Sequence, residues 1–224
     1  MRIYRLDKTV LSVRNNPAQF LNGLTSNSLD QPQNAFLTIH GRIVATFDQV
    51  KAGEDCILLC VEKAFVDATL RHTERYLKLS RTTMAREDYG VYFDLDGKYS
   101  PDWNEFVIAQ KKGQLILSRK VMNSNISDEE FTLFRLDNGI PRQGVDYTDD
   151  FALNVSETDF VSYTKGCFLG QEPVSKVHNR SKPTWKLVAR YADECSGEER
   201  AKMTSCVKEP SSGREKGFVF VGNP

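Results

Sequence analysis

The residues most capable of chemistry lie in a glycine-framed turn, Lys165-Gly-Cys-Phe-Leu-Gly-Gln-Glu172. A glycine before the cysteine lets the backbone turn tightly and leaves the Cys167 sulfur open to a ligand. Lys165 and nearby backbone amides favour the thiolate. A short helix beginning near Gly170 would add amide donors and the positive end of its dipole a few residues away. The turn therefore predicts an exposed, functional thiol.

Two alternatives compete with this interpretation of Cys167. A free cysteine is more commonly a small buried hydrophobe. His178 follows eleven residues later and could form a Cys–His pair, although a surface histidine in a basic segment is the simpler interpretation. We expect His40, in a hairpin turn, and His72, on the polar face of a helix, to be solvated.

The other four cysteines show no pattern of a disulfide framework or a zinc site. Cys56 and Cys60 bracket Ile-Leu-Leu in a strand-like run, so we assign them to the core. Cys195 and Cys206 have no C-x-x-C spacing, so we expect two unpaired thiols and no metal site. The chain also lacks a Ser-His-Asp order, a P-loop and a Rossmann fingerprint.

Composition places the chain among cytoplasmic globular proteins. Its 224 residues allow one large or two modest domains, and 40% hydrophobic with 27% charged residues argues against disorder. The charges of thirty basic and thirty acidic residues cancel, so the protein has no net positive charge to attract nucleic acid. We therefore expect no direct nucleic-acid binding. We expect no signal peptide at the N-terminus and no membrane span, because no apolar run approaches the roughly 20 residues that a span needs.

Hydrophobic periodicity predicts an α+β protein. Predicted strands are Val10–Val13, Ala35–Ile39, Ile43–Val50, Cys56–Val61, Gly90–Leu95, Glu105–Ala109, Gln114–Leu117, Thr184–Tyr191, Met203–Val207 and Gly217–Val221. Four helices are predicted. The first begins at Pro17 with Asn16 as its N-cap, and the second spans Ala64–Leu79. The third begins at a Ser127 capping box and ends at Asn138, and a short fourth helix follows Gly170. Residues 142–160 are predicted to be a polar loop.

These elements suggest a division of the chain into an α+β region and a small C-terminal β unit. The α+β region covers residues 1–182 and can be divided near residue 80, into 1–80 and 81–182. The β unit covers residues 183–224.

The turn resembles the signature of the YgfZ family of folate-binding proteins, relatives of the glycine cleavage T-protein (aminomethyltransferase). Three other segments agree with the family in order and spacing. Phe20–Asn27 resembles its N-terminal helix and turn, His40-Gly-Arg42 its KG[KR] hairpin, and Arg135–Pro141 its E-x-G-x-P segment. Because the T-protein lacks the KGC cysteine, Lys165-Gly-Cys167 favours the YgfZ branch.

The resemblance implies a T-protein-like fold of mixed α/β layers around a central cavity, with a C-terminal β-barrel that is reduced in this short chain. It implies binding of tetrahydrofolate or a derivative. Phe131 lies where some relatives carry a folate-contacting tryptophan, although an aromatic on an amphipathic helix is usually a core residue. The other folate-binding candidates are Tyr163, Lys165, Gln171, Glu172 and Arg180.

Three functions follow from this resemblance, in order of preference. The first is an accessory protein that supports assembly or repair of iron–sulfur client enzymes, including tRNA-thiolating ones, through Cys167 and without turnover of its own. The second is a folate-dependent aminomethyl or one-carbon transferase, for which Asp48 is the candidate carboxylate. The third is a protein-docking scaffold that has lost folate, suggested by the short chain and by departures from the family at Ser28, Asn154 and Ser181.

Overall fold

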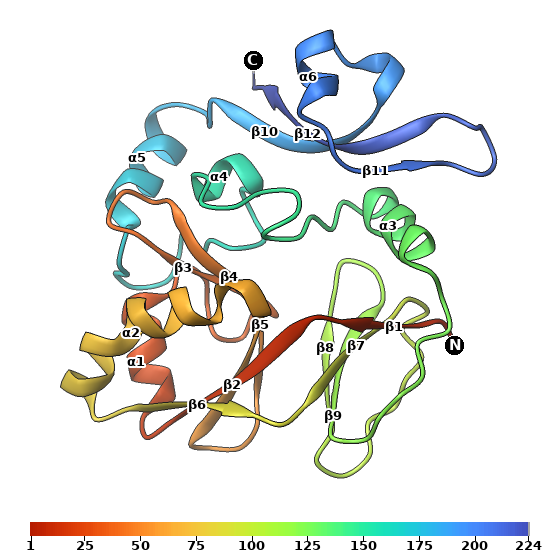
Figure 1. Ribbon diagram of the computed structural model, residues 1–224. Coiled ribbons are helices and arrows are strands. Elements are labelled where there is room, and N and C mark those ends of the chain that lie inside the picture. Colours follow the sequence, from red (N-terminus) through yellow and green to blue (C-terminus); the bar gives the residue numbers. More distant parts are fainter. Residues whose placement is uncertain (224) are drawn as a thin grey trace.

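A computed structural model describes residues 1–223 and contains three antiparallel sheets (Figure 1). The five-stranded sheet has the order β3 (Gln33–Leu37), β4 (Ile43–Lys51), β5 (Cys56–Glu62), β2 (Lys8–Arg14), β6 (Thr83–Glu87). The four-stranded sheet has the order β1 (Ile3–Leu6), β7 (Gly90–Asp94), β9 (Gln114–Ser118), β8 (Phe106–Ala109). The predicted α+β class is confirmed.

The two larger sheets are joined by chain segments that pass from one to the other. β1 leads into β2 through Asp7, and β6 leads into β7 after a short connection. β5, Cys-Ile-Leu-Leu-Cys-Val-Glu, is buried along its whole length between β4 and β2. A strand covered on both faces has a continuous apolar sequence instead of an alternating one. Cys56 and Cys60 are therefore core residues, as predicted.

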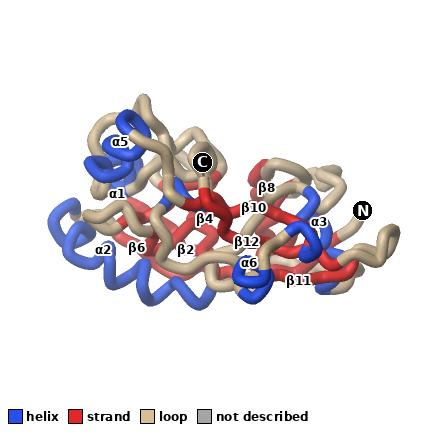
Figure 2. Tube along the Cα trace, turned by 90° about the horizontal axis from the view of Figure 1, so that it is seen from above, coloured by secondary structure: helices blue, strands red, loops and turns tan. Residues whose placement is uncertain are grey.

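Helices α1 (Pro17–Leu24) and α2 (Val66–Ser80) bury their apolar faces in a hydrophobic cluster with the five-stranded sheet. Figure 2 shows them with α5 (Gln171–Arg180) toward one end of the molecule. Asn16 occupies the predicted N-cap position, but it is left-handed and its side chain caps nothing. Instead, Asp55 accepts hydrogen bonds from the Asn16 amide, at 2.9 Å, and from the preceding amide. His72 is half-buried near Phe36, not fully solvated as predicted.

Helix α3 (Asp128–Asp137) lies between the four-stranded sheet and the C-terminal sheet (Figure 1). The predicted cap is confirmed, because the Ser127 hydroxyl accepts a hydrogen bond of 3.1 Å from the Glu130 amide. Phe131 faces inward and stacks on Tyr4 with ring centroids 4.1 Å apart. One turn later, Arg135 is buried as well. The inner face of α3 therefore carries both an aromatic ring and a guanidinium.

The C-terminal unit is an open three-stranded sheet, which corrects the predicted reduced barrel. Its order is β10 (Trp185–Tyr191), β12 (Glu215–Gly222), β11 (Thr204–Lys208), so β10 and β11 are edge strands within residues 1–223. Three short strands are too few to close on themselves. Instead, Leu187 and Phe218 pack into a hydrophobic cluster with residues from α4 (Ala152–Val155). The division into 1–182 and 183–224 stays a prediction.

Five elements within residues 1–223 were not predicted: β1, β6, α4, α6 (Gly197–Ala201) and the single 3-10 turn Ala192–Glu194. β6 is an edge strand whose side chains are mostly exposed, so its sequence lacks a buried face. α4 is a single turn within the predicted polar loop, yet three of its four residues are buried. No helix within residues 1–223 is long and apolar enough to cross a membrane.

Candidate functional site

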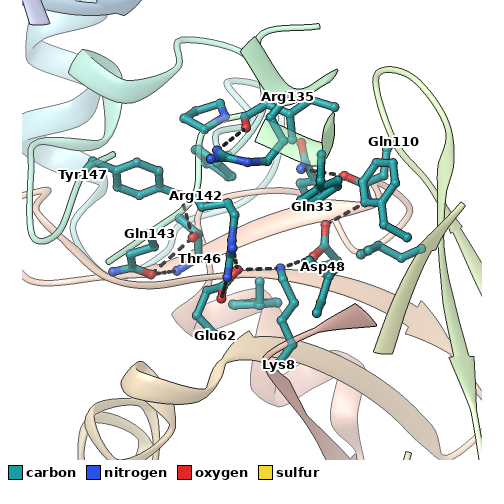
Figure 3. Close-up of a pocket in the computed structure, with 18 residues that line it drawn as sticks. Lys8, Gln33, Thr46, Asp48, Glu62, Gln110, Arg135, Arg142, Gln143 and Tyr147 are labelled. Carbon is teal, nitrogen blue, oxygen red and sulfur yellow. Dashed lines mark hydrogen bonds and ion pairs between the residues drawn. The ribbon is translucent and has the colours of Figure 1, made fainter. Parts of the chain in front are cut away.

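A polar cavity lies where the two larger sheets meet α3 and the loop that follows it (Figure 3). Its free volume is about 50 Å³, room for one or two water molecules at the rough volume of 30 Å³ that each occupies in liquid. Aromatic rings form much of its wall: Phe47, Phe93, Phe131, Tyr147 and Phe160. Three glutamines and five charged side chains also line it. The cavity thus combines flat apolar surfaces with many hydrogen-bonding groups.

Four charges from distant parts of the chain neutralise one another at the floor of the cavity. In Figure 3, Lys8 points up between Asp48 and Glu62. Its Nζ lies 2.7 Å from Asp48 Oδ2 and 3.5 Å from Glu62 Oε1. Arg142 Nη2 lies 2.9 Å from the other Glu62 oxygen. All four side chains are at most 22% exposed. Each charge therefore loses most of its hydration on folding, and the oppositely charged partners have to compensate for that loss.

The pKa values of these groups reflect opposing effects of burial and charge. Burial disfavours the cation of Lys8, but Asp48 and Glu62 outweigh burial, so the Lys8 pKa is raised. Burial also disfavours the Glu62 carboxylate, yet Lys8 and Arg142 outweigh it and hold the Glu62 pKa below its ordinary value. Lys8 and Glu62 are therefore both charged at neutral pH.

Amide side chains extend this polar surface. Gln110, at the end of β8, donates to Asp48 Oδ1 at 2.9 Å and accepts from Gln33 at 3.3 Å. Gln143 Oε1 accepts from the Thr46 amide at 2.8 Å. An amide presents both a donor and an acceptor. The cavity can therefore match a ligand edge on which donors and acceptors alternate.

Arg135 contributes an unsatisfied donor on the opposite side (Figure 3). Its two terminal nitrogens are engaged, Nη1 by Asp146 at 2.8 Å and Nη2 by the Ser205 hydroxyl at 2.8 Å. Its Nε, however, is buried and has no hydrogen-bond partner. An unpaired buried donor costs free energy that a ligand acceptor would recover.

Of the folate-binding residues and the thiol predicted from the sequence, Phe131 alone lines this cavity, together with Asp48, the candidate carboxylate of the transferase alternative. The others lie together on the segment 163–180, which includes α5: Tyr163, Lys165, Cys167, Gln171, Glu172 and Arg180. Their predicted contacts with folate stay predictions. Within residues 1–223, no group of three or more His, Cys, Asp or Glu is placed to hold a metal ion.

The Cys167 turn docks on the segment Phe20–Asn27, the other part of the sequence signature. Lys165 Nζ donates to the main-chain carbonyls of Thr25, at 2.6 Å, and Asn27, at 3.0 Å. Partial burial lowers the pKa of Lys165 to about 8. The lysine anchors the turn, while Cys167 is exposed, as predicted, and is not the small buried hydrophobe of the alternative.

The side chains after the thiol have local roles. His178 stacks on Tyr163 with ring centroids 3.6 Å apart, and no hydrogen bond joins His178 to Cys167 in the described part of the chain. Gln171 Oε1 accepts a hydrogen bond of 3.4 Å from the Phe168 amide. Glu172 and Arg180 are exposed on α5. The helix predicted after Gly170 is confirmed.

Gly170 gives a direct test of how this turn is held. Its φ of +86° favours glycine, and an added Cβ would lie 2.4 Å from the Thr38 carbonyl oxygen. We expect Gly170→Ala to lower the free energy of unfolding by about 1–3 kcal/mol, measured by urea denaturation. Gly166→Ala is the matched control, because no atom lies within 4 Å of its added Cβ. Equal losses in the two variants would contradict this account.

Sequence reasoning missed most of the cavity residues. Lys8, Glu62, Gln110 and Arg142 were not proposed, and Asp48 entered only through the transferase alternative. One signal was available, because Glu62 closes the apolar run Cys56–Val61 and Asp48 lies inside the predicted strand Ile43–Val50. A carboxylate in such a strand needs a buried partner. The sequence does not show which cation supplies it.

No family model matches the chain. An uncharacterized protein of Haemophilus influenzae is 25% identical over 156 residues, which cover 64% of this chain. The match spans only 55% of that relative, about half its length.

Among solved structures, the chain is similar to the glycine cleavage system aminomethyltransferase T of Bartonella henselae, with a TM-score of 0.72. The alignment covers 98% of this chain and 78% of that chain at 11% sequence identity. At this identity the likeness establishes the fold alone. The protein has the T-protein-like α+β fold, with an open three-stranded sheet at its C-terminal end.

Proposed function

We propose that the protein is a tetrahydrofolate-binding accessory protein that supports assembly or repair of iron–sulfur enzymes, including tRNA-thiolating ones. The observation that carries the folate part is the central cavity, whose aromatic walls, paired amides and unsatisfied Arg135 donor lie within an aminomethyltransferase fold. The sequence signature around Cys167 supports the accessory role. An accessory role that works through Cys167 needs an accessible thiol, and Cys167 is exposed.

The chemistry of the cavity suits a reduced pterin. Such a ring is flat, and its edge alternates N–H donors with a carbonyl acceptor. Asp48 and the glutamine amides would accept from its N–H groups, and Arg135 Nε would donate to its acceptor. Phe131 would supply an aromatic face.

The present volume of about 50 Å³ is too small for the ring. Binding therefore has to move wall side chains. Arg142, the most exposed of the four floor charges, and Gln110 are the side chains we expect to move.

Cys167 would act outside the cavity. It is exposed on the turn before α5, and it does not belong to the cavity wall. A thiol in that position can reach a partner protein without displacing folate. We therefore assign folate to the cavity and the client enzyme to the Cys167 turn.

Titration with 5-formyltetrahydrofolate, followed by calorimetry, tests the proposal. We expect the wild type and Cys167→Ala to bind with equal affinity, and only Cys167→Ala to lose activity of an iron–sulfur tRNA-modifying enzyme in cells. Cys206→Ala is the control, because Cys206 is also an exposed free thiol. Absence of binding would leave the docking scaffold as the function, and full cellular activity of Cys167→Ala would remove the role of the thiol.

A one-carbon transferase is the second candidate, because Asp48 does line the cavity. However, Lys8 engages one of its oxygens and Gln110 the other. For Asp48 to take a proton from a substrate, the ligand would first have to displace one of these partners. Folate-dependent methylene transfer that is abolished in Asp48→Asn would favour this candidate over the accessory role.

A further inference from the structure

We propose that the groove beneath the C-terminal sheet is a second compartment of the cavity and receives the carboxylate-bearing tail of the ligand. We further propose that Lys111 both closes the partition between the compartments and binds that tail. This inference rests on the proposed folate function and specifies where each part of the ligand is held.

Three chain segments form the partition between the cavity and the groove. Each segment places one residue on the cavity side and its neighbour on the groove side: Gln110 and Lys111, Ile140 and Gly139, Phe160 and Asp159. Pro141 lines both spaces. The two spaces are therefore separated by a wall about one residue thick.

The Lys111 ammonium joins the three segments. Its Nζ lies 2.6 Å from Asp159 Oδ2 and donates to the Gly139 carbonyl at 3.2 Å. Lys111 is 43% exposed and Asp159 14%, so the ion pair faces the groove and is accessible to a competing anion. Because the lysine side of the pair is accessible, an incoming anion can replace Asp159 at Lys111 at small cost. The Asp159 segment is itself fixed from the other side, where the Asp159 main-chain carbonyl accepts a hydrogen bond from Asn27 Nδ2 at 3.0 Å, so the exchange involves only the side-chain contact.

The groove has the size and chemistry for the rest of a folate. Its volume is about 560 Å³, within the usual range of ligand pockets, roughly 300–1,000 Å³. Leu153, Val155 and Phe218 provide an apolar wall suited to an aryl ring. Lys186 adds a second cation to the lining. A flat polar head in the cavity, an aryl middle and an anionic tail would fit the two compartments in that order.

Two ligands separate this inference from the proposed function. 5-Formyltetrahydrofolate carries the tail, and 6-methyltetrahydropterin has only the ring. We expect the tailed ligand to bind the wild type at least about tenfold more tightly, the effect of one charge-assisted contact. Lys111→Met should reduce this preference severalfold, leaving the part that the aryl contacts supply, without weakening the tail-less ligand. Asp159→Asn, which frees Lys111, should strengthen binding of the tailed ligand severalfold.

Matched control variants come from the same turn and the same groove. Lys112→Met removes the neighbouring exposed charge in the β8–β9 turn, and Glu157→Gln removes another acid of the groove; neither should change the preference. Equal affinity for both ligands, or an equal effect of Lys111→Met and Lys112→Met, would overturn the inference and leave folate binding in place. If neither ligand binds, the proposed function falls, and this inference falls with it.

Discussion

Asp146→Ala is expected to lower the free energy of unfolding by about 3–5 kcal/mol, measured by urea denaturation at pH 7. Asp146 Oδ2 lies 2.8 Å from Arg135 Nη1, and the two side chains are 0% and 3% exposed. Without the carboxylate, a guanidinium stays buried without its counter-ion. Burial lowers the pKa of Arg135, but arginine cannot escape by losing its proton at working pH.

The same carboxylate also connects the C-terminal sheet to the rest of the protein. Its Oδ1 accepts hydrogen bonds from the hydroxyls of Thr204, at 2.9 Å, and Ser205, at 2.5 Å, both on β11. We therefore expect faster amide hydrogen exchange in β11 of Asp146→Ala, in addition to the lower global stability.

Asp149→Ala is the matched control. Asp149 lies in the same loop and pairs with Arg42 at 3.3 Å, but its side chain is 73% exposed. Exposed pairs contribute about 0–1 kcal/mol. The double variant Arg135→Met/Asp146→Ala should recover part of the loss, because it leaves no buried charge. A loss of stability in Asp149→Ala equal to that in Asp146→Ala would contradict the assigned role of the buried pair.

The fold was largely predictable because its strands carry their own signal. β5 is apolar from Cys56 to Val61, and α3 has both a Ser127 cap and an Asn138 end. The prediction of a reduced C-terminal barrel was wrong for a physical reason. The sequence shows that three C-terminal strands exist, but the decision between closure and packing on α4 depends on contacts with residues far along the chain.

The candidate site was less predictable, because its charges meet only in three dimensions. Lys8 opens β2, Asp48 lies within β4, Glu62 ends β5 and Arg142 follows α3. Nothing local links Lys8 to a carboxylate forty residues later. By contrast, Cys167 has glycines and a lysine beside it, so sequence analysis found the turn and its exposure but not the cavity.

Lys8→Met is expected to reverse the pH dependence of stability contributed by the cavity floor. In the wild type, Glu62 has a pKa below its ordinary value of 4.5. Such a group contributes stability above pH 4.5 that is lost as the pH falls through the lower, folded-state value. Acid should therefore destabilise the wild type.

In Lys8→Met, Asp48 and Glu62 remain buried with less positive charge beside them. The loss at pH 7 should be about 3 kcal/mol or more, as for a broken buried pair. Burial would then dominate and raise the Glu62 pKa above its ordinary value. A carboxyl with a raised pKa binds its proton more tightly when folded, so stability should increase as the pH falls from 7 to 5. The gain should be about 1–3 kcal/mol, since one pKa unit corresponds to about 1.4 kcal/mol.

Urea denaturation from pH 7 to about pH 3 measures both slopes: the gain of Lys8→Met between pH 7 and 5, and the loss of the wild type below the ordinary glutamate pKa of 4.5. Lys63→Met is the control, because Lys63 pairs with Asp7 at 3.6 Å and both side chains are more than two-thirds exposed; its stability should follow the wild type. Adding Glu62→Gln to Lys8→Met removes one buried charge and should flatten the rise toward acid. If the stability of Lys8→Met instead follows that of the wild type over this whole pH range, the floor charges are not coupled. The cavity would then be a hydrated pocket whose carboxylates are free to ionise independently of Lys8.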